Sequence, residues 1–147
     1  MIQLLKVTAF NLPRTTRLTG ASLALLIGVV HLWVYLHTAA PGYLEGLFLT
    51  AAAGSVAAAA GILAGSRSMG WWLGVATGVL GFAGYIASRA LGFPGFAEAI
   101  GAWHNALGTT ALALESSLLA LYGSLLHGCN VDSPAKRDWD TYFSAEQ

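Results

Sequence analysis

Two ionisable residues in the second half of the chain lie where they could do chemistry in apolar surroundings. Arg89 closes an apolar run that also contains Tyr85, and Glu115 lies inside the next apolar run. An ionisable residue within a membrane span is costly, and it usually faces a charged partner, a cavity or an ion path. Glu45, at the start of an earlier run, offers Arg89 a second carboxylate. The pattern predicts an intramembrane polar cluster of Arg89, Glu115, Glu45 and Tyr85.

Two histidines suggest a different chemistry. His31 lies within the first apolar run and His104 at the start of the last one. Two imidazoles from different helices at one depth can ligate a b-type haem in a helical bundle. His31 and His104 are therefore candidate haem b ligands, and with Glu45 they are alternatively a mixed site suited to zinc or copper. A histidine that only hydrogen-bonds to a neighbouring helix is the simpler interpretation.

Glu115 itself permits two interpretations. Intramembrane carboxylates carry protons or cations in pumps and exchangers, so Glu115 could serve a small proton-coupled transporter. Small four-span multidrug exporters place such a glutamate in their first span, and the first apolar run here contains none. In the structural interpretation, Glu115 is protonated and hydrogen-bonded to a neighbouring helix, because a bare charge in hydrocarbon is costly.

The composition indicates the elements that must position these residues. Of 147 residues, 56% are hydrophobic and 10% are charged, whereas soluble domains contain about 25% charged residues. Four apolar runs, at about 18–36, 44–64, 69–91 and 103–126, have roughly the 20 residues that a transmembrane helix requires. The sequence predicts an all-α, single-domain integral membrane four-helix bundle with short loops and a polar tail over 127–147.

Helical spacing predicts which faces of these spans pack together. Small residues let two helix backbones approach closely in a membrane. Such residues recur on the second and third spans at Gly61 and Gly65 and at Gly70, Gly74 and Gly78. On the fourth span, His104 and Glu115 are eleven residues apart, or three turns plus about 20°, which predicts that they share one face.

Basic residues predict the orientation. One side of a four-span arrangement receives all but one of them: Lys6, Arg14, Arg17, Arg67, Lys136 and Arg137. Arg89 alone falls on the other side. Because cytoplasmic segments are enriched in Lys and Arg, both termini are expected in the cytoplasm, with the chain in the inner (plasma) membrane.

Several classes of function are disfavoured. The net charge is zero and no basic patch is present, which argues against nucleic-acid binding. The single cysteine, Cys129, cannot form an internal disulfide. With no convincing catalytic set, we expect a non-catalytic subunit or accessory protein of a larger, energy-transducing membrane complex. Its partners would be the lipid bilayer and other membrane subunits or a second copy of itself. Haem-based electron transfer and proton-coupled transport remain alternatives.

One stretch carries a resemblance to other proteins. The run Ser88–Gly95, followed by a glutamate within the next span, resembles small uncharacterised four-span membrane proteins of GC-rich bacteria. The His31–Tyr35 stretch and the Gly46–Leu49 start of the second span add to the likeness. The resemblance implies a fold and no activity.

Overall fold

The computed structural model describes residues 12–65 and 69–127. Its four long helices are α2 (Arg14–His37), α3 (Gly42–Leu63), α4 (Met69–Ala90) and α5 (Ala106–Leu126), and the short 3₁₀ helix η2 (Ala97–Ala99) lies between α4 and α5. All four long helices are long and apolar enough to span a membrane. The predicted all-α class with four candidate spans is confirmed.

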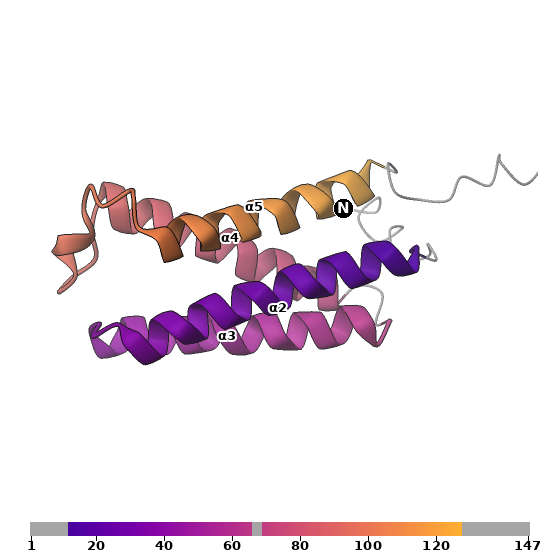
Figure 1. The fold of residues 1–147 in the computed structure, drawn as a ribbon, viewed down its shortest axis with the longest axis horizontal. Coiled ribbons are helices and arrows are strands. Elements are labelled where there is room, and N and C mark those ends of the chain that lie inside the picture. The colour runs from indigo at the N-terminus through magenta and orange to yellow at the C-terminus, as the bar shows by residue number, and fades with distance from the viewer. Residues whose placement is uncertain (1–11, 66–68, 128–147) are drawn as a thin grey trace, which may run out of the picture.

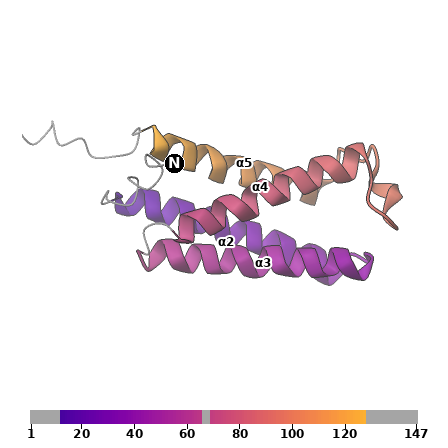
Figure 2. The same cartoon turned by 180° about the vertical axis from the view of Figure 1, so that it is seen from behind.

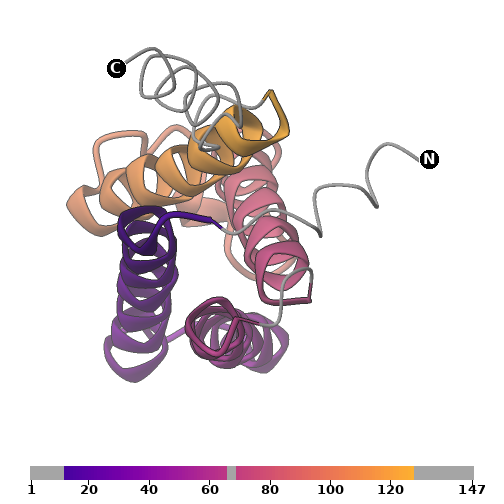
Figure 3. The same ribbon diagram turned by 90° about the vertical axis from the view of Figure 1, so that its right-hand side faces the viewer.

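The four helices form an up-and-down bundle in which sequence neighbours are spatial neighbours. Viewed along the bundle, α2, α3, α4 and α5 stand at the corners of a square, and α5 returns to lie beside α2 (Figure 3). In Figures 1 and 2 the α2/α3 pair approaches the α4/α5 pair at the end where α2 begins. The two pairs diverge toward the end that carries the 38–41 and 91–105 connections. We call these the closed half and the open half.

The closed half contains the packed core. Its buried members come from all four helices: Ala21, Ala24, Ile27, Ala58, Ala59, Ile62, Trp71, Leu118, Tyr122 and Leu125. A Cβ atom built on Gly70 would lie 2.6 Å from the carbonyl carbon of Gly61, so α3 and α4 touch backbone to backbone. This contact agrees with the close approach predicted from the glycine spacing. The space beside Gly20 is filled by the ring of Trp71.

Arg17 ties α2 to the end of α3 in the closed half. Its Nε donates to the carbonyl of Ile62 at 3.3 Å, and its guanidinium also donates to the carbonyl of Leu63. The last carbonyls of a helix have no partner within the helix. The arginine therefore caps the C-terminal end of α3 with a charged donor.

The connection between α4 and α5 lies at the end of the open half. Gly92 and Gly95 adopt φ angles of 77° and 73°, which favour glycine, and they allow the tight turn around Pro94. The hydroxyl of Tyr43 donates to the carbonyl of Pro94 at 2.6 Å. The connection is therefore fastened to the start of α3.

Some predictions concern residues outside the described part of the chain. These are the basic residues Lys6, Arg67, Lys136 and Arg137, the single Cys129, and all but the first residue of the polar tail over 127–147. Within the described part, α5 begins at Ala106, three residues after the predicted start of the fourth span. His104 consequently precedes the helix.

Candidate functional site

A cavity of about 430 Å³ occupies the open half. Residues from all four helices and from the α4–α5 connection line it, and most of its wall is aliphatic or aromatic. The wall includes Val30, Leu44, Phe48, Leu80, Phe93 and Leu107. Both its volume and its apolar lining are typical of sites for small molecules.

A buried histidine–glutamate pair lies at the inner end of this cavity. His31 of α2 lines the cavity, and its Nε2 is 3.7 Å from Oε1 of Glu115 on α5. The side chains are 11% and 1% exposed, respectively. Beneath the pair, Ile27 and Leu118 belong to the core of the closed half. The pair therefore marks the boundary between the cavity and the packed core.

Gly81 of α4 makes room for the glutamate. A Cβ atom at this position would collide with the Glu115 carboxyl group, and Gly81 also lines the cavity. A Cβ atom built on Gly78, one turn earlier, would lie 3.9 Å from the backbone carbonyl oxygen of Glu115. The glycine face of α4 thus admits the carboxyl group between α2 and α4.

The hydrogen bonds of the pair define its chemistry. His31 Nδ1 lies 2.9 Å from the carbonyl oxygen of Ile27, and because a carbonyl only accepts, Nδ1 carries the hydrogen. Nε2 is then the nitrogen free to take up or release a proton, and it faces Glu115. The 3.7 Å separation is longer than a hydrogen bond. A small shift, or a polar atom placed between them, would connect the two groups.

Glu115 retains an unsatisfied oxygen. Within the described residues, Oε2 is buried and has no hydrogen-bond partner. Leaving a buried polar atom unpaired costs free energy, more so when the group is charged. The pair therefore combines a free ring nitrogen and an unpartnered carboxyl oxygen, which is an arrangement able to bind a proton.

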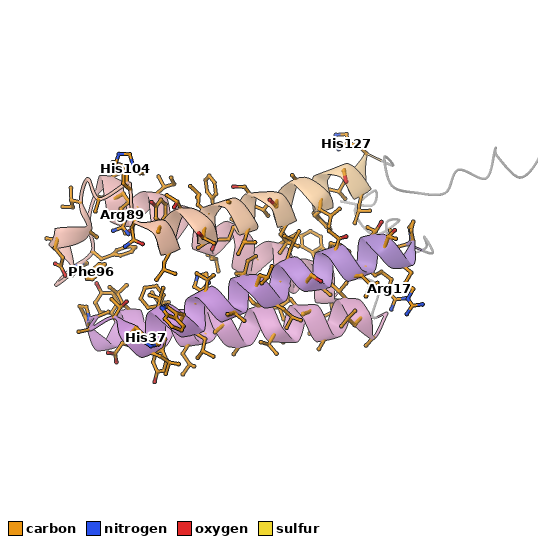
Figure 4. The ribbon with its side chains drawn as sticks, viewed as in Figure 1. Arg17, His37, Arg89, Phe96, His104 and His127 are labelled. Carbon is orange, nitrogen blue, oxygen red and sulfur yellow. The ribbon has the colours of Figure 1, made fainter. Side chains whose placement is uncertain are left out.

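Arg89 lies at the opposite, outer end of the cavity. Figure 4 shows it at the end of the bundle that also carries Phe96 and His104, while Arg17 and His127 lie at the other end. Its Nη1 donates to the carbonyl of Ala99 at 3.2 Å, and its guanidinium carbon lies 5.0 Å from the ring centre of Tyr85. Tyr85 in turn donates to the carbonyl of Trp103.

The structure brings together only part of the polar cluster predicted from the sequence. Arg89 and Tyr85 are in contact, but Glu115 faces His31 instead of Arg89. Arg89 is eight residues beyond Gly81 on α4, which separates it from the glutamate by about 12 Å along the helix. Glu45 is partly buried on α3 and does not line the cavity. In the described residues, no ion pair joins Arg89 to either carboxylate.

The two candidate haem ligands are not brought together. His104 is exposed in the turn before α5 and is not among the residues that line the cavity. Glu115, the partner of His31, lies about 14 Å of helix rise beyond the start of α5, which His104 precedes. Across residues 12–65 and 69–127, no three His, Cys, Asp or Glu side chains gather closely enough to hold a metal ion. The geometry thus offers no support for the haem or mixed-metal hypotheses.

Sequence reasoning missed the pairing of His31 with Glu115, although a signal for it existed. His31 lies six residues before the end of α2, and Glu115 lies nine residues after the start of α5. Both helix ends belong to the open half. By helix rise, His31 lies about 9 Å from the end of α2, and Glu115 lies about 14 Å from the start of α5. In an up-and-down bundle the first and last helices are neighbours. Comparing these two depths places His31 among the candidate partners of Glu115, although it does not single it out.

No protein-family model, curated protein or solved structure matches this chain. The resemblance to small four-span proteins of GC-rich bacteria stays a prediction, and the function must be inferred from the geometry.

Proposed function

We propose that this chain is an integral membrane protein that binds a small, mostly apolar molecule in its cavity, with occupancy coupled to the protonation of the His31–Glu115 pair. One observation carries the proposal: the pair lies at the inner end of the cavity, with Glu115 buried behind the lining residue His31. Buried acid–base groups in an apolar pocket are the usual mark of a binding site. This develops the proton-coupled alternative for Glu115.

The membrane placement is part of the proposal. We place the four helices across the inner (plasma) membrane, with the closed half and both termini on the cytoplasmic side. Arg14 and Arg17 lie at the closed end of the bundle and Arg89 at the open end. The remaining basic residues of the sequence follow the same bias, which supports this orientation by the positive-inside rule. The cavity would then open toward the outer side.

The geometry supports a defined route for the proton. A proton or polar group that enters the cavity meets His31 first, because Glu115 does not line the cavity. Nε2 of His31 is its free acceptor and faces the carboxyl group of Glu115. The core residues Ile27, Leu118 and Tyr122 block the way toward the closed end. Proton and ligand therefore enter and leave by the same side in this conformation.

Filling the cavity tests whether it binds. Gly84 lines the cavity, and a Cβ atom there would meet nothing within 4 Å, so the side chain of Gly84→Leu begins in open space and occupies part of the cavity. Gly123 on α5 is also a helical glycine with open space at its Cβ, but it lies outside the cavity, so Gly123→Leu is the matched control. The probe is N-phenyl-1-naphthylamine, a neutral apolar fluorophore, titrated into protein in nanodiscs and followed by energy transfer from tryptophan.

We expect wild type and Gly123→Leu to bind the probe equally, and Gly84→Leu to bind it at least about tenfold more weakly, a loss of roughly 1.4 kcal/mol. Infrared difference spectra should show a carboxyl band that changes on probe binding and vanishes in Glu115→Gln. Equal signals from all three proteins and from empty nanodiscs would refute binding. Saturation with the probe and no carboxyl change would refute the coupling.

A second function, membership of a larger membrane assembly, is favoured by the outer face of α5. We infer it from residue size: between Gly108 and Leu125, every exposed residue of α5 is Ala, Ser or Thr. The exposed faces of the other three helices carry large side chains such as Leu26, Val56 and Leu80. Small residues and hydroxyls support close packing between membrane helices, whereas large apolar residues suit lipid.

Blue-native electrophoresis of native membranes tests this second function. We expect the protein to migrate well above the mass of its monomer or dimer. Ala113→Leu, which enlarges the small face, should shift it to the lower mass, whereas Ala53→Leu on the exposed face of α3 should not. Migration of the wild type as a monomer or dimer alone would remove the subunit hypothesis.

A further inference from the structure

Arg89 lines the cavity and has an unused donor. Its Nε is buried and, within the described residues, has no hydrogen-bond partner. The rest of the guanidinium is held in place, because Nη1 donates to Ala99 and the group lies against the Tyr85 ring. Among the described residues that line the cavity, Arg89 is the only Arg, Lys, Asp or Glu. A fixed guanidinium with a free edge is suited to bind a carboxylate or phosphate.

Within the described residues, no carboxylate forms an ion pair with this arginine. Glu115 lies about 12 Å deeper along the bundle, and neither Glu45 nor Glu98 lines the cavity. An unpaired donor in an apolar wall costs free energy. An anionic ligand would remove this cost, and a cationic ligand would be repelled.

Neighbouring polar groups at the outer end are also donors. Asn105 lines the cavity, and its Oδ1 accepts the backbone N–H of Gly108 at 3.0 Å, so its amide nitrogen is the part left to bind a ligand. The hydroxyl of Thr38 lies in the same lining. Together with Arg89, Asn105 gives the outer end of the cavity nitrogen donors, and these lie beside hydroxyl groups that can also accept.

Below Arg89 the lining changes to hydrocarbon. Val34, Leu44, Leu47 and Phe48 form wall between the level of Arg89 and that of His31. This apolar stretch matches a chain of methylene groups, each of which gains about 0.8 kcal/mol when it leaves water. The site thus has an anion-binding outer end and an apolar interior.

From this arrangement we infer that the ligand is a medium-chain carboxylate, with its head bound by Arg89 and its chain in the cavity. The inference rests on the proposed function, because it names the ligand class of the same cavity. In this arrangement the His31–Glu115 pair lies beyond the end of the ligand's hydrocarbon chain and does not contact its carboxylate head. A single-chain phosphate lipid shares the anionic chemistry, and the test separates the two sources.

Competition against N-phenyl-1-naphthylamine tests the inference in nanodiscs of neutral lipid, under conditions where decanoate is ionised. Decanol and decyltrimethylammonium have the same chain with a neutral and a cationic head, and decanoyl-lysophosphatidate represents the phosphate lipid. The variants are Arg89→Gln, Arg89→Lys and Arg17→Gln. Arg17 is an arginine of the closed half outside the cavity, so its variant is the matched control.

We expect decanoate to displace the probe from wild type at least about tenfold better than decanol. This preference should vanish in Arg89→Gln, persist in part in Arg89→Lys and remain whole in Arg17→Gln. The charge-preserving lysine variant keeps the test decisive if the glutamine variant does not fold.

Other outcomes overturn the inference. Equal competition by decanoate and decanol would refute binding of an anionic head by Arg89. A preference that survives in a folded Arg89→Gln would refute it as well. Stronger competition by decanoyl-lysophosphatidate overturns the carboxylate in favour of a phosphate. In each case the probe still binds, so the proposed function stands. Absence of probe binding to wild type refutes the proposed function itself.

Discussion

At the scale of single residues, the site depends on a missing side chain. The carboxyl group of Glu115 occupies the space where a Cβ atom of residue 81 would lie. His31 approaches the same carboxyl group from the neighbouring helix α2. The site of Glu115 therefore depends on two residues that are far apart in the sequence, a glycine on α4 and a histidine on α2.

Gly81→Ala should displace the glutamate. Because the new methyl group collides with the carboxyl group, we expect a destabilisation of about 1–3 kcal/mol, measured by denaturant titration in mixed micelles. Gly84→Ala is the control, because a Cβ there meets open space and alanine gains about 1 kcal/mol of helix propensity. Adding Glu115→Ala should relieve most of the damage at residue 81. Additive effects of the two substitutions would contradict the collision.

At the scale of elements, helix ends decide which side chains reach the site. α5 begins after Asn105, whose side chain accepts the backbone N–H of Gly108 and so caps the helix. This cap leaves His104 in the preceding turn, outside the helical face that contains Glu115. Apolar run lengths gave the four spans, but they could not locate this start, because Trp103 and Ala102 are as apolar as the helix itself.

Removing the cap should weaken α5. We expect Asn105→Ala to cost about 1 kcal/mol of unfolding free energy, because the N–H of Gly108 loses its acceptor. Thr109→Ala is the control, since its hydroxyl only donates to carbonyls of its own helix start. The same denaturant titration compares the two. A cost for Thr109→Ala as large as that for Asn105→Ala would show that the cap is not the stabilising contact.

The sequence predicts the helices of this protein better than it predicts which side chains meet between them. The apolar spans and the glycine contact of Gly61 with Gly70 follow from composition and spacing. The partner of Glu115 does not, because a sequence gives no distance between helices, and the carboxyl group of Glu115 lies within reach of two of them. The sequence predicts Arg89 as part of a polar cluster, yet its contact with the Ala99 carbonyl depends on how the 91–105 connection folds back.

At the scale of the whole molecule, the two halves of the bundle differ in how they are stabilised. The closed half has a continuous core of alanine, large aliphatic and aromatic residues. The open half has a cavity of about 430 Å³ in the corresponding place. Side chains around a cavity lose the dispersion contacts that a filled core provides. The open half should therefore open locally at a lower free energy than the closed half.

Hydrogen exchange read by mass spectrometry in nanodiscs measures this difference. We expect amides of α2 near His31 to exchange faster than those near Ala21, and amides of α5 near Ala111 to exchange faster than those near Leu121. Comparing the two ends of one helix controls for membrane burial, because each end is within one turn or two of an interface. Filling the cavity with Gly84→Leu should slow exchange in the open half and leave the closed half unchanged, while Gly123→Leu should change neither. Uniform protection along both helices would mean that the cavity does not weaken the bundle. The open half would then be as resistant to local opening as the closed half.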